Sequence, residues 1–269
     1  MKETEKIKTP PFTDMADELF GRAASAPAGV RMATVRTGGV TITRVEILRE
    51  GLERPRGHYI TIEVPEVSLL DERDEAVILA ASRELNTLLP KSGHVLCIGV
   101  GNRHVTADAL GPCTARHILV TSDGSGVPQL PGLREVSAVA PGASAATGIP
   151  LAKIVLALVH ELKPAAVLCI DSLSSGEAGR LGHSIQFSDT GLGAGRPESM
   201  RSLLPEMLGV PVIAAGIPTM CQTREESGLV MVPRALDAVI GHGAALLGTA
   251  INKALQPKFS ISQLCYLTG

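Results

Sequence analysis

The sequence predicts an α/β protein in which helices flank a mostly parallel sheet, with an antiparallel hairpin near the N-terminus. Four short runs are apolar almost throughout, which is typical of parallel strands buried on both faces. Helical patterns separate these runs, as expected for parallel strands joined by crossover helices. The apolar runs are residues 94–100, 134–140, 165–170 and 210–216, and the helical patterns are residues 107–120, 150–162 and 199–207.

The hairpin is predicted by residues 30–48, "VRMATVRTGGVTITRVEIL", in which apolar and polar residues alternate on both sides of Gly38-Gly39. A glycine pair between two alternating runs indicates a tight two-residue turn. Residues 58–65 alternate again and predict another strand.

The remaining elements follow from helical periodicity and its stop signals. Residues 14–25 predict the start of a short helix after a polar leader, residues 1–13. Residues 70–89 carry an apolar face and end before Pro90, because proline cannot continue a helix. A last helix, rich in Ala, Leu and Gly, is predicted at residues 233–255.

The amino-acid composition indicates which kind of protein this is and which partners it can bind. The chain has 269 residues and is 45% apolar, enough for one main α/β domain with a substantial core. Its 25 basic and 27 acidic residues form no long run of one sign, so direct binding of nucleic acid or of an anionic membrane is not expected. Aromatic residues make up only 2%, which argues against stacking platforms for bases. A small neutral substrate or a protein partner is favoured.

The cysteines and the chain start indicate a soluble intracellular protein. The five cysteines lack C-x-x-C spacing and mostly lie in apolar runs, so we expect buried free thiols in a reducing compartment. The N-terminal "MKETEKIKTPPFTD" has no apolar core of a signal peptide, and no segment reaches about 18 uncharged apolar residues.

The run "CIGVGNRHVTADALGP", residues 97–112, has the outline of a nucleotide-binding loop. A dinucleotide fingerprint needs a third glycine where this sequence has His104, and the Gly-Lys-Ser/Thr of a P-loop is missing. The loop instead offers Asn102 and Asp108 just beyond a predicted buried strand.

Two carboxylates follow predicted strands, namely Asp108 and Asp171. The alternative for each alone is a helix cap, which explains Asp171, followed by Ser172, equally well. Two carboxylates from neighbouring strands cannot both ionise at close range, so one keeps a proton while the other can activate water, as acid-type peptide hydrolysis requires. Alternatively, the pair holds a divalent metal with His104 or His183 as a third ligand.

The loop that contains Asp108 resembles a motif of a known family. The run "GVGNRHVTADALGP" is similar to the "GLGN-x-x-VTPDALGP" motif of the germination protease, an endopeptidase that degrades small acid-soluble proteins when bacterial spores germinate. The chain departs from the family in having "ADALGP" for "PDALGP", and in the short "MCQTREESG" where members carry a longer insertion. Further similar segments occur in the same order: "TDMADE", "GHYITIEVPE", "VSAVAPGASAATGI", "VLCIDSLSS", "IQFSDTG", "GVPVIAAGIPT" and "INKALQP".

The resemblance implies roles for particular residues. The two catalytic aspartates of the family fall on Asp108 and Asp171, acting on water as general acid and general base without a cofactor or metal. Asn102 would orient a carboxylate or the peptide carbonyl, and Asp189 of "SDTG" is a supporting candidate, although a turn-forming role explains Asp189 equally well.

The resemblance also implies a zymogen. Family members remove a short N-terminal propeptide at a site similar to the Glu-(Phe or Ile)-Ala-Ser-Glu motif of their substrates, and residues 14–18, "DMADE", match that pattern. Cleavage between Asp14 and Met15 would separate a propeptide, residues 1–14, from a single peptidase domain, residues 15–269. The family further implies a homotetramer in the cytoplasm of the spore core, and a Gly/Ala-rich last helix would permit close subunit contacts.

Two other readings remain open. The implied fold is similar to that of the hydrogenase-maturation peptidases, a phosphorylase-like α/β fold, and such relatives would make the chain a metal-dependent peptidase that trims one partner protein. A catalytically silent spore protein that keeps the fold is the third reading. Dependence on a metal distinguishes the first of these from the two-aspartate endopeptidase.

Overall fold

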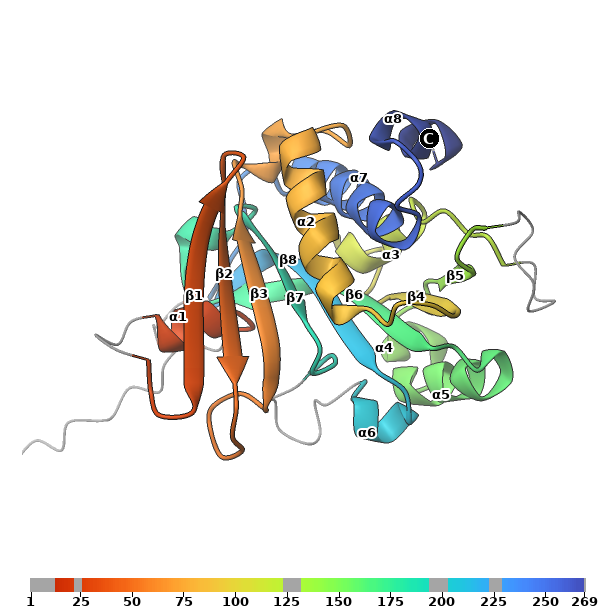
Figure 1. Cartoon of the computed structure of the whole chain (residues 1–269), viewed down its shortest axis with the longest axis horizontal. Coiled ribbons are helices and arrows are strands. Elements are labelled where there is room, and N and C mark those ends of the chain that lie inside the picture. The colour runs from red at the N-terminus through yellow and green to blue at the C-terminus, as the bar shows by residue number, and fades with distance from the viewer. Residues whose placement is uncertain (1–12, 22–25, 123–131, 194–202, 223–228, 269) are drawn as a thin grey trace, which may run out of the picture.

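The computed structural model describes residues 13–21, 26–122, 132–193, 203–222 and 229–268. Within these residues a single nine-stranded sheet has the order β1-β2-β3-β7-β8-β6-β4-β5, with β9 paired to β8. Helices cover both faces of this sheet (Figure 1). The strands are β1 Val30–Thr37, β2 Val40–Ile47, β3 Gly57–Glu63, β4 Val95–Gly99, β5 Val136–Val139, β6 Ala166–Ser175, β7 Ser184–Ser188, β8 Val212–Gln222 and β9 Val230–Met231.

The helices confirm the predicted fold class and alternate with the parallel strands along the chain. The α-helices are α1 Ala16–Phe20, α2 Glu75–Leu88, α3 Leu110–Ala115, α4 Ser144–Thr147, α5 Leu151–Leu162, α6 Pro205–Leu208, α7 Leu236–Leu255 and α8 Ile261–Thr268. Three short 3₁₀ helices are η1 Val67–Leu69, η2 Thr106–Asp108 and η3 Ala178–Arg180. No helix in the described part of the chain is both long and apolar enough to span a membrane.

The sheet is parallel on one side and antiparallel on the other. Strands β5, β4, β6 and β8 pair in parallel, so their carboxyl ends share one edge of the sheet. Strand β7 pairs antiparallel with β8 and with β3, and thereby joins the predicted hairpin β1-β2 and strand β3 to the parallel half. The antiparallel part is therefore larger than the sequence predicts. It includes β7, which was not among the predicted strands.

Two faces of the sheet carry separate apolar clusters. One face packs against α2, α3 and α7, which lie together above the sheet in Figure 1. The other face packs against α5 and α6 beside the parallel strands, and against α1 beside the antiparallel strands. Between the α5/α6 cluster and the α1 cluster lies a polar row of residues, which is where the site is found.

Several boundaries differ from the predictions for local reasons. Helix α2 begins at Glu75 instead of residue 70, because Asp74 caps it by accepting a hydrogen bond from the Val77 N–H. The pattern at residues 107–120 forms η2 and the short α3 instead of one helix. Strands β6 and β8 extend well past the predicted ends at residues 170 and 216, to Ser175 and Gln222.

Other predictions fall partly on residues that are not described. Of the helix predicted at residues 199–207, the described part shows α6 at Pro205–Leu208, and residues 199–202 lie outside the description. Most of the shortened segment, residues 223–228, also lies outside it. All five cysteines are free, as predicted, and Cys113 alone among them is only half-buried.

The small residues of α7 serve packing within the chain. A Cβ on Gly243 would lie 2.9 Å from the Ile217 Cδ1 atom, and one on Gly248 would lie 2.5 Å from the His117 Cβ atom. These glycines let α7 approach β8 and the end of α3 closely. The two glycines therefore have a packing role inside the core, and the predicted subunit contacts of this helix stay a prediction.

Candidate functional site

The loop after β4 is folded so that Asp108 returns to its beginning. The Val100 N–H donates to the Ile170 carbonyl (2.8 Å), which places the start of the loop against β6. Gly101 has a φ of 118°, and a Cβ on it would lie 2.1 Å from the Asp108 carbonyl oxygen. The Asn102 N–H then donates to Asp108 Oδ2 at 2.7 Å. Glycine is therefore required at residue 101, and the turn fixes the Asp108 carboxylate.

Asn102 contributes to this arrangement through its backbone. Its side-chain Oδ1 accepts a hydrogen bond from the His104 N–H (3.0 Å), which closes a local turn. The His104 side chain itself is exposed, and His183 lies half-buried in the turn before β7. Among the described residues no group of three or more His, Cys, Asp or Glu side chains is arranged to hold a metal ion.

Partial burial raises the pKa of Asp108. The half-buried position raises the pKa of Asp108 above its ordinary value, because desolvation disfavours the charged carboxylate, and the hydrogen bond from the Asn102 N–H opposes this only in part. Asp108 therefore keeps its proton to a higher pH than an exposed aspartate. This is the property expected of a general acid.

Asp171 lies on the neighbouring strand, half-buried within β6. Its Oδ1 accepts a hydrogen bond from the Ser172 N–H (2.8 Å), which stabilises the charged carboxylate. The charge of Asp171 adds to burial in raising the pKa of the Cys169 thiol on the same face of β6. The helix η2, which ends at Asp108, contacts both β6 and β8. The structure thus brings Asp108 and Asp171 to the same edge of the sheet.

A row of paired residues runs from Asp171 toward the antiparallel half. Asp171 pairs with Gly216 of β8, Gly216 pairs with Gln186 of β7, and Gln186 pairs with Thr61 of β3. Residues opposite one another in a sheet project from the same face. Neighbouring strands are roughly 4.8 Å apart, so the backbones of Asp171 and Gln186 are separated by roughly 10 Å. Gly216 contributes no side chain to the space between them.

The segment at residues 13–18 is docked on this row. The Asp14 carbonyl accepts a hydrogen bond from Gln186 Nε2 (2.7 Å), and the Ala16 N–H donates to Gln186 Oε1 (3.3 Å). The Asp14 N–H donates to the Ser174 carbonyl at 2.7 Å. Met15 and Ala16 are completely buried. The predicted cleavage point, the bond between Asp14 and Met15, is therefore held beside the strand that carries Asp171.

Asp189 lies elsewhere. It follows β7, and because β7 runs antiparallel to β8, its end lies at the opposite edge of the sheet from the end of β6. Asp189 accepts a hydrogen bond from the His58 N–H, and His58 Nδ1 lies 2.7 Å from Asp189 Oδ2. The structure thus gives Asp189 a contact with the start of β3 and does not bring it to Asp108 and Asp171.

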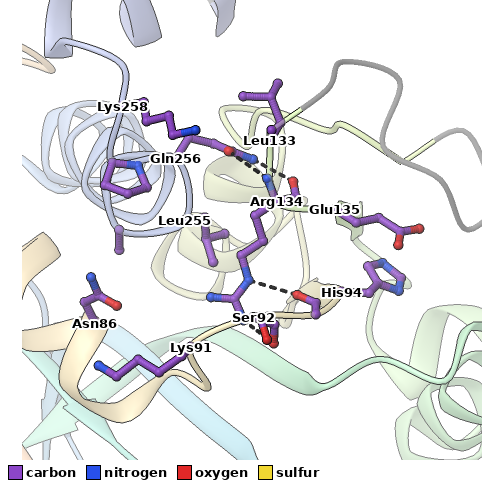
Figure 2. Close-up of a pocket in the computed structure, with 14 residues that line it drawn as sticks. Asn86, Lys91, Ser92, His94, Leu133, Arg134, Glu135, Leu255, Gln256 and Lys258 are labelled. Carbon is purple, nitrogen blue, oxygen red and sulfur yellow. Dashed lines mark hydrogen bonds between the residues drawn. The ribbon is translucent and has the colours of Figure 1, made fainter.

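Two cavities help to locate the site. A cavity of about 230 Å³ is lined by the turn at Gly101, by α3 and by the loop after β5, and so borders the Asp108 loop. A second cavity, of about 560 Å³, is lined by residues just before β4 and β5 and by the end of α7 (Figure 2). There the Arg134 guanidinium donates to the Gly93 carbonyl (2.9 Å), and Gln256 bonds the Arg134 backbone. Because that cavity lies at the amino ends of the strands, it is separate from Asp108 and Asp171.

The sequence missed the residues that hold residues 13–18. These are Arg54, Ser174, Ser175, Arg180 and Gln186, which come from the loop before β3 and from residues 174–186. Ser174 and Ser175 end the segment "VLCIDSLSS" and Gln186 lies in "IQFSDTG", but neither motif indicated a contact with residues 13–18. Their contacts depend on the strand order β3-β7-β8-β6, which no local pattern encodes.

The fold and the site define an α/β protein with two half-buried carboxylates beside the carboxyl end of β4, Asp108 in the loop after that strand and Asp171 within the neighbouring parallel strand β6, in the region where such folds bind their ligands. The family model described as germination protease matches residues 13–227 of the chain. The chain therefore belongs to the germination protease family, and thus to the peptidases. The match begins at Thr13, so it includes the docked segment.

Individual members of the family are similar over most of the chain. The germination protease of Caldanaerobacter subterraneus subsp. tengcongensis is 35% identical, and the match covers 85% of this chain and 89% of that protein. The germination protease of Clostridium acetobutylicum is 29% identical over 88% of this chain and 91% of that protein. That of Bacillus velezensis is 37% identical over 68% of this chain and 54% of that protein.

Proposed function

We propose that this protein is an endopeptidase that initiates the degradation of small acid-soluble spore proteins at germination. It is made as a zymogen that removes residues 1–14 by cleaving the bond between Asp14 and Met15. The observation that carries this proposal is the docking of residues 13–18 against β6, with the Asp14 carbonyl bound to Gln186 in the row that begins at Asp171. The chain holds its own predicted cleavage segment beside a candidate catalytic residue.

The two aspartates would divide the acid and base roles according to their surroundings. Asp108, with its raised pKa, is suited to donate a proton to the leaving nitrogen. Asp171, whose carboxylate accepts the Ser172 N–H, is suited to take a proton from the attacking water. Each proton transfer of this kind contributes about 10²–10⁴-fold to the rate.

The family resemblance supports a proposal for the compartment, the oligomeric state and the substrates. We propose that the protein works in the cytoplasm of the spore core as a homotetramer, and that its substrates are the proteins and not the nucleic acid that they coat. The near-balance of 25 basic and 27 acidic residues supports the last point.

The test is the intact mass of the full-length chain before and after incubation at mildly acid pH. Wild type is expected to lose residues 1–14 and to cleave an added Glu-Ile-Ala-Ser-Glu peptide. Asp171→Asn and Asp108→Asn are expected to stay whole and to leave the peptide whole. The matched control is Asp237→Asn, which changes an exposed aspartate at the start of α7 and is expected to process normally.

Two results would contradict the proposal. A wild-type chain that keeps its mass and leaves the peptide intact favours the catalytically silent reading. Processing by both Asp→Asn variants at the wild-type rate shows that other residues perform the reaction. Circular dichroism of each variant separates lost chemistry from lost folding.

A further inference from the structure

A buried arginine contacts the docked segment on the N-terminal side of the proposed cleavage point. Arg54, from the loop between β2 and β3, is only 5% exposed. Its guanidinium donates to the Thr13 carbonyl, and Nη2 lies 3.8 Å from Asp14 Oδ1. Arginine is almost never buried unless it is paired, because desolvating its charge is costly. Residues 13 and 14 therefore supply compensation for a buried cation.

Further contacts of Asp14 recognise a carboxylate on an extended main chain. Asp14 Oδ2 accepts the Ser174 N–H at 2.8 Å, and the Asp14 N–H donates to the Ser174 carbonyl at 2.7 Å. Gln186 Nε2 donates to the Asp14 carbonyl. None of these groups depends on which residues precede Asp14, so an acidic residue of another peptide chain can make the same contacts.

The downstream residues are held by a separate set of groups. Asp17 Oδ2 lies 2.8 Å from Arg180 Nη2, and Asp17 Oδ1 accepts from the Thr61 hydroxyl. The Glu18 carboxylate accepts from the Ser175 hydroxyl and from the Gly176 N–H. Residues 15–18 remain part of the chain when residues 1–14 leave, so they must vacate the row before a substrate binds there, whereas Thr13 and Asp14 are removed by the cleavage.

We propose that Arg54, the Ser174 N–H and the Gln186 amide form the subsite for an acidic side chain immediately N-terminal to the cleaved bond. Asp14 fills this subsite before processing, and the acidic residue of a substrate peptide fills it afterwards. The inference rests on the proposed function and deepens it, because it names the residue that selects substrates.

The geometry favours glutamate over aspartate in this subsite. The 3.8 Å between Arg54 Nη2 and Asp14 Oδ1 exceeds the usual charge-assisted hydrogen bond by about 1 Å. A glutamate is longer by one methylene group, so its carboxylate reaches the guanidinium. Asp14 is therefore a weaker occupant than the substrate residue, which suits a segment that must leave.

The test measures selectivity, which a purely structural arginine would not change. The processed protein is given three peptides, Glu-Ile-Ala-Ser-Glu and its variants beginning with Asp or Gln, each with blocked ends. Wild type is expected to cleave the Glu peptide fastest, with kcat/KM about 10–100-fold above that of the Gln peptide. Arg54→Gln is expected to bring this ratio close to 1, and Arg54→Lys to an intermediate value. Arg83→Gln, an exposed arginine of α2 on the other face of the sheet, is the matched control.

A second set of variants leaves the subsite unchanged, so it remains informative if Arg54→Gln does not fold. In the full-length chain, Asp14→Glu is expected to speed the release of the leader and Asp14→Asn to slow it by about 10-fold or more. The subsite is refuted if Arg54→Gln keeps the wild-type Glu/Gln ratio, or if Asp14→Asn processes at the wild-type rate. A wild-type chain that cleaves neither leader nor peptide refutes the proposed function, and the subsite with it. A wild-type chain that cleaves all three peptides equally refutes the subsite alone.

Discussion

Replacing Gly101 by alanine tests how tightly the loop after β4 encloses Asp108. The residue has a φ of 118°, a conformation that side chains with a Cβ rarely adopt, and its new Cβ would lie 2.1 Å from the Asp108 carbonyl oxygen and 3.0 Å from Asp108 Oδ1. The contact atom at 2.1 Å belongs to the backbone, so no side-chain rotation relieves the overlap. The loop must open, and Asp108 must move.

The magnitude comes from two costs. Holding a non-glycine residue in a sparsely populated backbone region costs about 1–3 kcal/mol. Overpacking a close contact costs about another 1–3 kcal/mol. Gly101→Ala is therefore expected to lower the free energy of unfolding by about 2–6 kcal/mol. Gly39→Ala is the matched control, because Gly39 has a φ of 83° but its new Cβ would meet no atom of the described chain within 4 Å.

The assay is urea denaturation of both variants, together with the rate of leader release. The difference in unfolding free energy between Gly101→Ala and Gly39→Ala isolates the contact with Asp108, and only Gly101→Ala is expected to slow processing. Equal destabilisation of the two variants, with processing unchanged in both, would refute the argument that Gly101 positions Asp108.

Three further predictions concern other parts of the molecule. The folded pKa of Asp108 exceeds its ordinary value of 3.8, so the stability that this residue confers is complete below pH 3.8 and is lost as the pH rises through the folded pKa. Asp108→Asn cannot ionise, so its unfolding free energy in urea, relative to that of wild type, should increase between pH 3 and pH 7. A decrease in this difference would contradict the argument. Gly241→Ala, at an exposed position of α7 with open space around its Cβ, should raise the unfolding free energy by about 0.5–1 kcal/mol in the same assay, and any decrease would be evidence against this helix boundary. Iodoacetamide should label Cys113 first in the native protein, as read by peptide mapping, since burial raises the pKa of Cys97 to about 12 and also raises that of Cys169; labelling of either buried thiol before Cys113 would contradict the packing.

The parallel half and the two aspartates were predictable because their signals are local. Each buried strand is a short apolar run, and Asp108 and Asp171 follow or end such runs. Since the carboxyl ends of parallel strands share an edge, the sequence already places both residues on the same side of the sheet. The glycine turn before Asp108 could be recognised in the sequence as a motif. Its contacts with Asp108 could be identified only from the structure.

The contacts of Asp14 and Asp189 were not predictable because they depend on strand order. Strand β7 spans only five residues, and its antiparallel pairing moves Asp189 to the far edge while bringing Gln186 into the row of Asp171. Arg54 contacts Asp14 from a loop that lies 40 residues further along the chain (54 − 14). Such long-range pairings arise from the packing of the whole sheet.

The measurement that tests the central claim most directly is the rate of Glu-Ile-Ala-Ser-Glu peptide cleavage as a function of pH, with and without a metal chelator. The two-aspartate account predicts a bell-shaped profile whose two apparent pKa values belong to the Asp108 and Asp171 pair, and a rate that the chelator leaves unchanged. Loss of activity in the chelator, with recovery on adding a divalent metal, would contradict the account and establish the metal-dependent peptidase instead.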